Sequence, residues 1–353
     1  MSVLGELGTL PLRIDGYELE RLQRDVSSDF TRVSTHIRLH GDGAEGIGED
    51  VTYDAEDQDV LQEAGAVQPL EGSWTIDSFC DHVATLDLWP RPALREPSVL
   101  YRRWAYESAA LDLALRQNGM ALHEAVGREP QPVNFVVSLR LGEPATMEPI
   151  ERRLQRYPTL KFKLDPTSSW TEELIAALVA TGAVDSVDFK GMYTGTIVDQ
   201  PADPVLYRRV VEAFPDAWIE DPKLVPETEE ILAGEHDRIT WDAIIHTVDD
   251  VEALPFAPKM INVKPSRAGG LRPLFALNRY CEERGIRRYG GGQFELGVGR
   301  GQIQYLASIF HPDTPNDVAP GGYNLVDPPE GLPSSPLAVA AHPTGFRWGD
   351  IGV

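Results

Sequence analysis

The chain has 353 residues, of which 42% are hydrophobic and 25% are charged, a composition typical of globular rather than disordered or membrane proteins. Its formal net charge of -23 would repel phosphate groups, which argues against nucleic acid or an anionic membrane as a partner. No apolar run reaches about 18 residues and the N-terminus lacks the basic start of a secretory signal, so we expect a cytoplasmic protein.

The first 128 residues are expected to form an α+β domain. Three runs alternate between apolar and polar residues and predict an antiparallel meander: 17–22, 31–39 and 44–51. Periodic apolar positions predict two helices: 74–88 and 98–117. The X-Pro steps in 129–132 disfavour helix and suit a linker to the next domain. Cys80 and Cys281 lack a metal-binding spacing and are expected to be buried thiols.

From residue 133 onward, short β-rich runs alternate with amphipathic helices, the pattern of a parallel sheet with helical crossovers. The predicted strands are 133–140, 160–164, 184–189, 217–220, 238–242, 259–264 and 286–290. Helices such as 171–181 and 272–284 fit between them. We expect residues 129–324 to form this second domain, and the Pro- and Gly-rich residues 325–353 to form a surface tail that can pack back on the first.

Charged residues recur at the ends of these strands, in steps of 22 to 32 residues. They are Lys163, Asp188, Glu220, Asp242, Lys264 and Glu295. A barrel of eight strand-helix units repeats roughly every 31 residues and carries its catalytic groups at the C-terminal ends of its strands. The pattern therefore predicts a functional site at the mouth of a barrel.

Three of these residues, Asp188, Glu220 and Asp242, are carboxylates at the ends of three successive strands. Hard oxygen ligands without His or Cys suit Mg²⁺, which keeps positions open for a substrate. Any one of them alone is explained as well by a helix-capping role. Their convergence at one mouth is the basis for predicting a metal site.

Lysines flank the carboxylates along the chain. Lys161 and Lys163 lie two apart on one predicted strand, so their side chains are expected to share a face. Two ammonium groups facing one cavity disfavour each other's charge, which would lower a lysine pKa toward the range in which the amine can act as a base. Lys264 would approach the same cavity from across the barrel. A divalent cation on the substrate carboxylate would stabilise the charge that develops when a lysine removes the α-proton. The alternative for Lys161 and Lys163 is a solvated sheet edge.

These motifs resemble the enolase superfamily, and specifically its muconate lactonizing enzyme subgroup, over residues 133–324. The runs that carry the resemblance are Lys161-Phe162-Lys163, Asp188, residues 218–222 (WIEDP), Asp242, residues 261–270 (INVKPSRAGG) and residues 290–300 (GGGQFELGVGR). The last two runs are most similar to o-succinylbenzoate synthases and N-succinylamino acid racemases. Gly46-Ile47-Gly48-Glu49 is similar to the family's capping domain. The resemblance implies a (β/α)7β TIM-like barrel with an N-terminal α+β capping domain.

The resemblance also implies a role for each site residue. Lys163 and Lys264 would be the acid-base pair, Lys161 would tune Lys163, and the cofactor Mg²⁺ would be held by Asp188, Glu220 and Asp242. Other residues are expected at the substrate or behind these groups: Lys190, Glu295, Arg267 and Phe30. Glu295 would orient Lys264, contact the substrate or bond the glycine-rich loop. Residues 266–270 around Arg267 would bind an anion or simply permit a turn. Loops 26–30, which include Phe30, and 52–54 would close over the substrate.

Two positions depart from the family pattern. The family commonly has Asp-Ala-Asn at the third strand, where this chain has Asp188-Phe189-Lys190. The usual Asp-Glu at the fifth strand is Asp242-Ala243. Lys190 would place an extra cation beside the metal, bind a second anionic group of the substrate, or pair with a ligand carboxylate. Both changes make the mouth more positive.

We therefore expect a Mg²⁺-dependent lyase or isomerase that removes the α-proton of a small-molecule carboxylate. Dehydration as in o-succinylbenzoate synthases, racemisation and cycloisomerisation all remain open. One alternative is a Schiff-base aldolase that uses a barrel lysine, and another is a ligand-binding protein without turnover. A homo-oligomer is compatible with this fold, but no motif sets the number of subunits.

Overall fold

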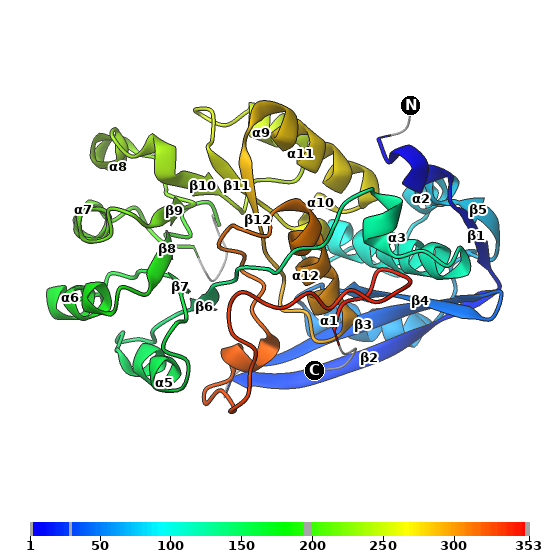
Figure 1. Cartoon of the computed structure of the whole chain (residues 1–353), viewed down its shortest axis with the longest axis horizontal. Coiled ribbons are helices and arrows are strands. Elements are labelled where there is room, and N and C mark those ends of the chain that lie inside the picture. Colours follow the sequence, from blue (N-terminus) through cyan, green and yellow to red (C-terminus); the bar gives the residue numbers. More distant parts are fainter. Residues whose placement is uncertain (1–2, 28–29, 194–198, 350–353) are drawn as a thin grey trace.

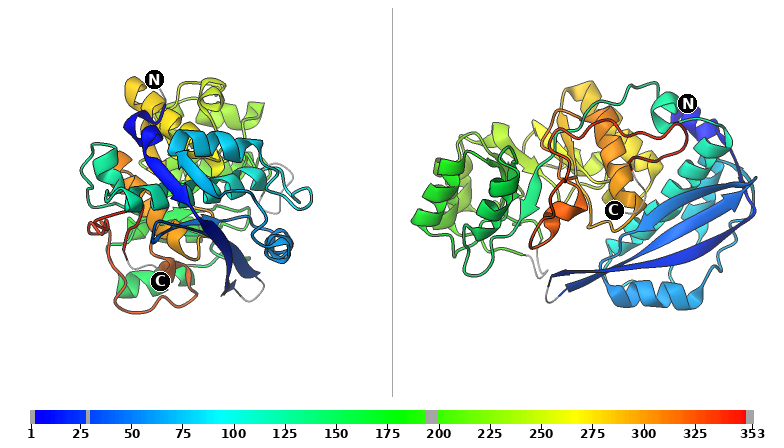
Figure 2. Two further views of the ribbon diagram at one scale, coloured as in Figure 1. Left: turned by 90° about the vertical axis from the view of Figure 1, so that its right-hand side faces the viewer. Right: turned by 60° about the horizontal axis from the view of Figure 1, so that its bottom comes forward.

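The computed structural model describes residues 3–27, 30–193 and 199–349. Its first domain contains an antiparallel sheet in the order β2-β3-β4, formed by Gly16–Ser27, Phe30–Gly41 and Ala44–Asp50. The predicted three-stranded meander is confirmed. In Figure 2 the long hairpin of β2 and β3 reaches from this capping domain toward the barrel. Of the predicted loop 26–30, residues 28 and 29 fall outside the described part of the chain, and Ser27 pairs with Phe30 at the end of β2.

A second, two-stranded sheet corrects the helix predicted over residues 74–88. β1 (Pro11–Ile14) pairs with β5 (Gly72–Thr75), so Trp74 and Thr75 are extended rather than helical. The helix α2 (Ile76–Thr85) starts only after Thr75, whose Oγ1 accepts the Ser78 N–H at 3.2 Å while Ser78 Oγ accepts the Thr75 N–H at 2.8 Å. This capping box sets the start of the helix.

The helix α3 (Ser98–Gln117) has the predicted bounds and lies across β4. A Cβ added to Gly48 on β4 would lie 2.0 Å from Ala105 O of α3, so only glycine allows the helix backbone to approach the strand this closely. The other helices of the capping domain are short: η1 (Gly5–Thr9), α1 (Ala55–Ala64) and α4 (Leu122–Ala125). The sequence patterns predicted none of these three.

Within the described residues, seven parallel strands form the barrel wall in the order β6 to β12. They are β6 Val137–Leu139, β7 Phe162–Leu164, β8 Val184–Asp188, β9 Trp218–Glu220, β10 Ile239–Trp241, β11 Met260–Val263 and β12 Arg287–Gly290. Each strand lies within its predicted range. Seven short parallel strands with buried residues on both faces match the near-continuous apolar runs of the sequence.

Helices connect these strands and cover the outside of the curved sheet (Figure 1). They are α5 Glu148–Arg156, α6 Glu172–Thr181, α7 Pro204–Ala213, α8 Pro226–Leu232, η2 His236–Arg238, α9 Val248–Glu252, α10 Pro265–Ala268, α11 Leu271–Arg284, α12 Val298–Phe310 and η3 Gly321–Asn324. Apolar side chains on their inner faces, such as Leu174 and Leu178 of α6, join the main hydrophobic core. The architecture is the predicted (β/α)7β TIM-like barrel with an N-terminal α+β capping domain.

The segment after α12 closes the barrel. Asn316 bridges to Phe135 before β6, and Asp317 bridges to Gly291 after β12. The Asn316 side chain joins the same two edges, because its Oδ1 accepts the Gly290 N–H at 2.6 Å and its Nδ2 donates to Asn134 O at 3.0 Å. This segment occupies the eighth strand position.

His311 supports this closure and makes it sensitive to pH. Its Nδ1 donates to Asn316 Oδ1 at 2.7 Å, since that oxygen is an acceptor. Burial lowers the pKa of His311 to about 3. The unfolded chain, with a pKa near 6.5, takes up the proton first as pH falls, so stability is complete above about pH 6.5 and declines on acidification.

We therefore expect a pH-dependent difference between the wild type and His311→Asn, which can keep the bond to Asn316 but cannot be protonated. Between about pH 7.5 and about pH 5, the free energy of unfolding of the wild type should fall by about 2 kcal/mol more than that of the variant. Urea unfolding measures both. Parallel pH profiles would contradict this role of His311.

Two carboxylates of the capping domain bind the N-termini of barrel helices. Glu49 on β4 accepts the N–H groups of Leu296 (2.6 Å), Gly297 (3.0 Å) and Gly299 (3.0 Å) at the start of α12. Glu107 on α3 accepts the Leu271 N–H at the start of α11 at 2.7 Å. Both carboxylates are buried, and helix N-termini carry unpaired donors and a partial positive charge. The capping domain is thus fixed to the barrel by charge-assisted hydrogen bonds.

A buried arginine joins the two domains at the neighbouring loops. The Arg32 guanidinium donates to Val51 O (2.6 Å) and Thr52 O (2.7 Å) in the capping domain. The same group donates to Gln293 O (3.0 Å) and Phe294 O (3.2 Å) in the loop after β12. The predicted substrate loop 52–54 is therefore anchored to the barrel loop.

The tail from residue 325 packs back on the capping domain, and part of it is buried rather than on the surface as predicted. Asp112 of α3 accepts the Phe346 N–H at 2.8 Å and pairs with Arg347 at 2.8 Å. Phe346 and Trp348 are buried, and both rings contact Tyr305 of α12. The end of the tail therefore covers α3 and α12 together.

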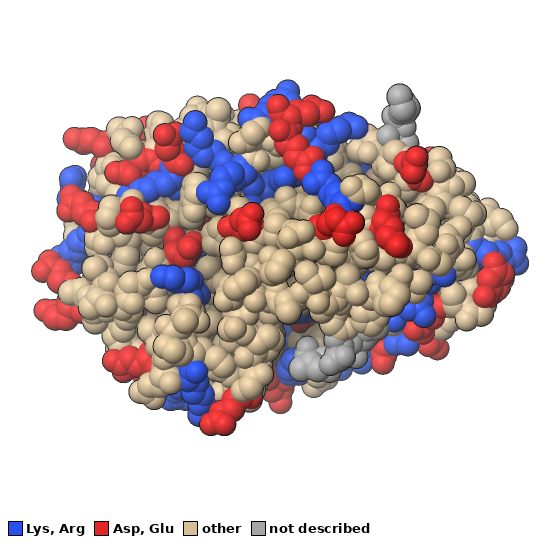
Figure 3. All heavy atoms as spheres, viewed as in Figure 1, with Lys and Arg blue, Asp and Glu red and all other residues tan. Residues whose placement is uncertain are grey.

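The cysteines, the apolar character of the helices and the surface charges can be compared with the expectations from composition. Cys80 and Cys281 are free and buried, as predicted. In the described part of the chain, no helix has both the length and the apolar character that a membrane crossing requires. Figure 3 shows acidic and basic side chains interspersed on one face, with a broad uncharged band across its centre.

Candidate active site

The barrel brings five predicted residues together at the C-terminal ends of its strands. Lys163 on β7 forms ion pairs with Asp188 of β8, at 3.3 Å, and with Glu220 of β9. Lys264, which follows β11, lies 2.7 Å from Asp242, which follows β10. All five side chains are buried. Because β8, β9 and β10 lie between β7 and β11 in the sheet, the carboxylates lie between the two lysines.

The carboxylates form a donor set that suits a hard divalent cation. Oxygens of Asp188, Glu220 and Asp221 lie within 4.8 Å of one another, and all three residues are buried. Burial, reinforced by the neighbouring Asp188, raises the pKa of Glu220 well above its usual value. Buried carboxylates that repel one another are stabilised by a bound cation, and oxygen ligands favour Mg²⁺. These residues therefore fit a divalent metal ion.

Asp242, the third predicted ligand, lies outside this closest group. Its carboxylate is engaged by Lys264 and Arg267, and it accepts the Tyr193 hydroxyl at 2.9 Å. These contacts hold the pKa of Asp242 well below its usual range although burial opposes ionisation. The carboxylate is thus kept ionised beside the cluster, and its role as a metal ligand stays a prediction.

Asp221 has a structural role that was not predicted from the sequence. Its two carboxylate oxygens accept the backbone N–H groups of Asp242 (2.8 Å) and Ala243 (2.9 Å). Its own backbone is left-handed, with φ at 46°. Burial, reinforced by Asp242, raises the pKa of Asp221 to about 7. Asp221 therefore shapes the turn that presents Asp242.

The two lysines differ in their electrostatic surroundings. Burial lowers the pKa of Lys163, but Glu220 and Asp188 outweigh this effect and hold the pKa well above its usual value. Burial also lowers the pKa of Lys264, and there the attraction of Asp242 is opposed by Arg267 and Lys163, so the net shift is downward. Environments that push two pKa values apart suit an acid and a base. Of the two lysines, Lys264 is therefore closer to its neutral, basic form.

Two residues of β12 and the loop after it contact the site, one at Lys264 and one at Glu220. A Cβ at Gly291 would lie 2.6 Å from Lys264 Cε, so glycine makes room for the lysine stem. Tyr289 of β12 donates its hydroxyl to Glu220 at 2.5 Å. Glu220 is thereby held from one side by Tyr289 and from the other by Lys163.

Lys161 does not reach the mouth, contrary to the prediction that it shares a face with Lys163 and tunes it. It is exposed, and its Nζ donates to Gly182 O at 2.6 Å, at the C-terminus of α6. Strand β7 begins only at Phe162, and its pairing with β8 shifts between Phe162 and Lys163, so regular alternation does not extend to Lys161. An ammonium at a helix C-terminus is favourable in its own right.

Lys190 pairs with Asp188, one of the three predicted alternatives. Its ammonium contacts Asp188 Oδ2, and its backbone N–H donates to Asp188 Oδ1 at 3.0 Å. Strand alternation does not produce this pairing, because β8 ends at Asp188 and Lys190 has a left-handed backbone with φ at 53°. Arg267 likewise pairs with Asp242 rather than pointing a free guanidinium at the mouth.

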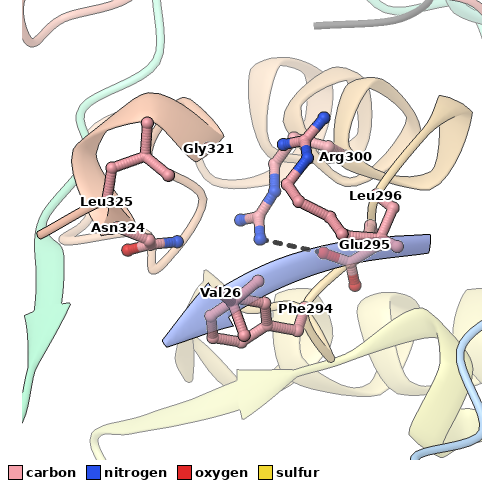
Figure 4. A pocket seen from close by; sticks show the side chains of 9 residues that line it. Val26, Phe294, Glu295, Leu296, Arg300, Gly321, Asn324 and Leu325 are labelled. Atoms are coloured by element: carbon pink, nitrogen blue, oxygen red, sulfur yellow. Dashed lines mark ion pairs between the residues drawn. The ribbon is translucent and has the colours of Figure 1, made fainter. Parts of the chain in front are cut away.

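Glu295 bonds the glycine-rich loop. Its Oε1 accepts the Gln293 N–H at 2.6 Å, and its Oε2 lies 3.1 Å from Arg300 Nη2. Figure 4 shows this ion pair at the edge of a small open recess. The recess is lined by Arg24, Val26, Phe294, Glu295, Leu296, Arg300, Gly321, Asn324 and Leu325. Phe30 starts β3, is exposed and is not part of this lining.

The recess is basic and has an unsatisfied donor. Arg24 of the capping domain and Arg300 of the barrel outnumber the single acid, Glu295. Arg300 Nε is buried and has no hydrogen-bond partner within the described chain. The recess therefore suits an anionic group, and the loop that carries Glu295 also carries Gly291 against Lys264.

Two domain families match most of the chain. The family described as "Domain of unknown function (DUF8230) C-terminal domain" matches residues 129–325, and the corresponding N-terminal domain family matches residues 5–125. These ranges cover the barrel and the capping domain. They leave the tail after residue 325 unmatched by either family.

The chain is also similar to named proteins. It is 27% identical over 331 residues to N-succinylamino acid racemase of Thermus thermophilus, covering 87% of this chain and 86% of that one. It is 26% identical to o-succinylbenzoate synthase of Bacillus subtilis over 60% of this chain and 57% of that protein. Among solved structures, dipeptide epimerase from Enterococcus faecalis matches with a TM-score of 0.66 at 18% identity, covering 97% and 100% of the two chains. Muconate cycloisomerase from Pseudomonas fluorescens matches with a TM-score of 0.64 at 17% identity, covering 96% and 93%.

Proposed function

The chain belongs to the DUF8230 family and is an enzyme of the enolase superfamily, and from this we propose that it removes the α-proton of a small carboxylate with Mg²⁺ as cofactor. The observation that carries the proposal is the position of the carboxylates Asp188, Glu220 and Asp242 between Lys163 and Lys264. Two amines on either side of a bound acid are what proton transfer at a carbon centre requires. The reaction would be a racemisation or a dehydration.

A Mg²⁺ ion held by Asp188, Glu220 and Asp242 would stabilise the charge that develops on the substrate carboxylate. Lys264, whose pKa burial lowers, would take the α-proton on one side. Lys163, kept protonated by Glu220 and Asp188, would return a proton from the other side. In a dehydration Lys163 would instead protonate the leaving hydroxyl group. Buried positions for both amines exclude competing water.

The substrate we propose carries a second anionic group. The recess of Arg24 and Arg300 lies beside the loop that packs on Lys264, so one molecule could place a carboxylate in each site. N-succinylated amino acids have this form, and the relatives named above include the N-succinylamino acid racemase of Thermus thermophilus. Racemisation of such a compound is the first candidate, and dehydration of the kind that o-succinylbenzoate synthases carry out is the second.

Metal removal tests the proposal. Deuterium exchange from D₂O into the α-position of N-succinylated and unsubstituted amino acids should be at least about 100-fold slower after EDTA treatment, and Mg²⁺ should restore it. Exchange should be faster for the succinylated compounds, because only they fill the recess. Unchanged exchange without metal, together with a lysine adduct trapped by borohydride, would instead indicate a Schiff-base enzyme.

A further inference from the structure

Lys190 has two carboxylates within reach. Its ammonium contacts Asp188 Oδ2 and lies 3.8 Å from Asp165 Oδ1. Asp165 directly follows β7 and, within the described chain, its Oδ1 is buried and accepts no hydrogen bond. Such an oxygen is costly to leave without a donor, because burial removes its contact with water. An ammonium 3.8 Å away could satisfy it by moving about 1 Å.

Only the end of the Lys190 side chain is free to make this movement. The Lys190 backbone is held by its N–H bond to Asp188 Oδ1 at 3.0 Å, and the next residue, Gly191, donates to Asp221 O at 2.9 Å. The Lys190 ammonium lies 5.2 Å from the ring centroid of Tyr193, whose face attracts a cation. The ammonium can therefore exchange carboxylates without leaving its place beside β8.

We propose that Lys190 is a movable counterion of the metal site: it neutralises Asp188 while no metal is bound and transfers to Asp165 when the metal takes Asp188. This inference rests on the proposed Mg²⁺ site. A carboxylate oxygen cannot keep a close ammonium contact and also give its charge fully to a cation, so Lys190 competes with the metal for Asp188. Asp165 lowers the free-energy cost of displacing Lys190 from Asp188, because it accepts the displaced ammonium. Lys190 and Asp165 are thus positioning residues for the cofactor.

Binding of Mn²⁺ to the full chain tests the proposal without reference to turnover. Free Mn²⁺, followed by its paramagnetic resonance signal, measures the dissociation constant for the wild type, Lys190→Met, Asp165→Asn and the double variant. We expect Lys190→Met to bind Mn²⁺ about 10- to 100-fold more tightly, because a charge-assisted contact to Asp188 is removed. Asp165→Asn should bind about 10-fold more weakly, because the displaced ammonium then meets a neutral amide instead of a carboxylate.

The double variant distinguishes the transfer of Lys190 to Asp165 from a simple effect of removing charges near the metal site. Without the ammonium there is nothing for Asp165 to receive, so Asp165→Asn should weaken binding several-fold less in the Lys190→Met background. Lys223→Met is the matched control, since this lysine pairs with Asp199 and its backbone lies against Gly191, the residue after Lys190. Among the described residues, no ion pair joins Lys223 to any of the three predicted ligands. It should change Mn²⁺ affinity by less than about threefold.

A crystal structure with Mn²⁺ gives a second, independent readout. We expect Lys190 Nζ within about 3.2 Å of Asp165 Oδ1 and no longer bonded to Asp188. Equal affinities for all the proteins, purely multiplicative effects in the double variant, or Lys190 still on Asp188 beside bound Mn²⁺ would overturn the counterion role alone. Absence of Mn²⁺ binding to every variant would instead overturn the metal site on which the proposed function depends.

Discussion

Replacing Lys163 or Lys264 by alanine is expected to slow α-proton exchange by about 100- to 10,000-fold, the contribution that a positioned acid or base makes to proton transfer. The two amines come from opposite ends of the row β7 to β11, with the carboxylates between them. Each variant should therefore lose exchange mainly for one enantiomer of a chiral substrate. Deuterium incorporation into separate D- and L-substrates measures both effects.

Lys161→Ala is the matched control for these variants. This lysine is two residues from Lys163, but it is exposed and donates to Gly182 O at the C-terminus of α6. Exchange should stay within about twofold of the wild type, because no charge is removed from the mouth. Loss of exchange in Lys161→Ala, or full exchange in both mouth variants, would contradict the proposed acid-base pair. Retained Mn²⁺ binding would show that the mouth variants are folded.

Glu49→Gln is expected to lower the free energy of unfolding by about 3 kcal/mol. The Glu49 carboxylate accepts four hydrogen bonds, from Ser34 Oγ at 2.7 Å and from three backbone N–H groups at the start of α12. An amide has one acceptor oxygen and turns its NH₂ group toward those donors. It also loses the negative charge that the helix N-terminus favours. Urea unfolding of the full chain measures the change.

Glu18→Gln provides the comparison on the same sheet. Glu18 of β2 is exposed, and its pairs with Arg38 and His40 are both 3.6 Å long. Its replacement should change the free energy of unfolding by less than about 0.5 kcal/mol, as is usual for surface ion pairs. If Glu49→Gln changed the free energy of unfolding equally little, the N-terminus of α12 would not depend on the Glu49 carboxylate.

The barrel strands and the residues at their ends could be predicted because both depend on local patterns. Each run is short, apolar and bounded by charge, and a parallel sheet buries such runs on both faces. Lys163, Asp188, Glu220, Asp242 and Lys264 then follow from the rule that strand ends gather at one mouth. The helix of residues 98–117 could also be predicted from the sequence, since the periodicity of its apolar residues is long and uninterrupted.

Other residues escaped prediction because their roles depend on contacts between distant segments. The shift in pairing between β7 and β8 that separates Lys161 from Lys163 has no signature in the sequence. Asp317, 3.6 Å from Lys163, lies in the eighth strand position, whose bridges form only when the barrel closes. Asp221 could have been recognised as a second acid after a strand end, but its bonds to the next strand's backbone could not.

The way Glu49 and Glu107 engage α12 and α11 limits how this enzyme can be recombined with its relatives. A chimera that joins this barrel to a foreign capping domain would need acids at both corresponding positions; otherwise four amide donors of the two helices would lie buried without acceptors. The start of α12 also continues directly from the loop that packs on Lys264. A poorly matched graft would therefore also disturb the placement of Lys264.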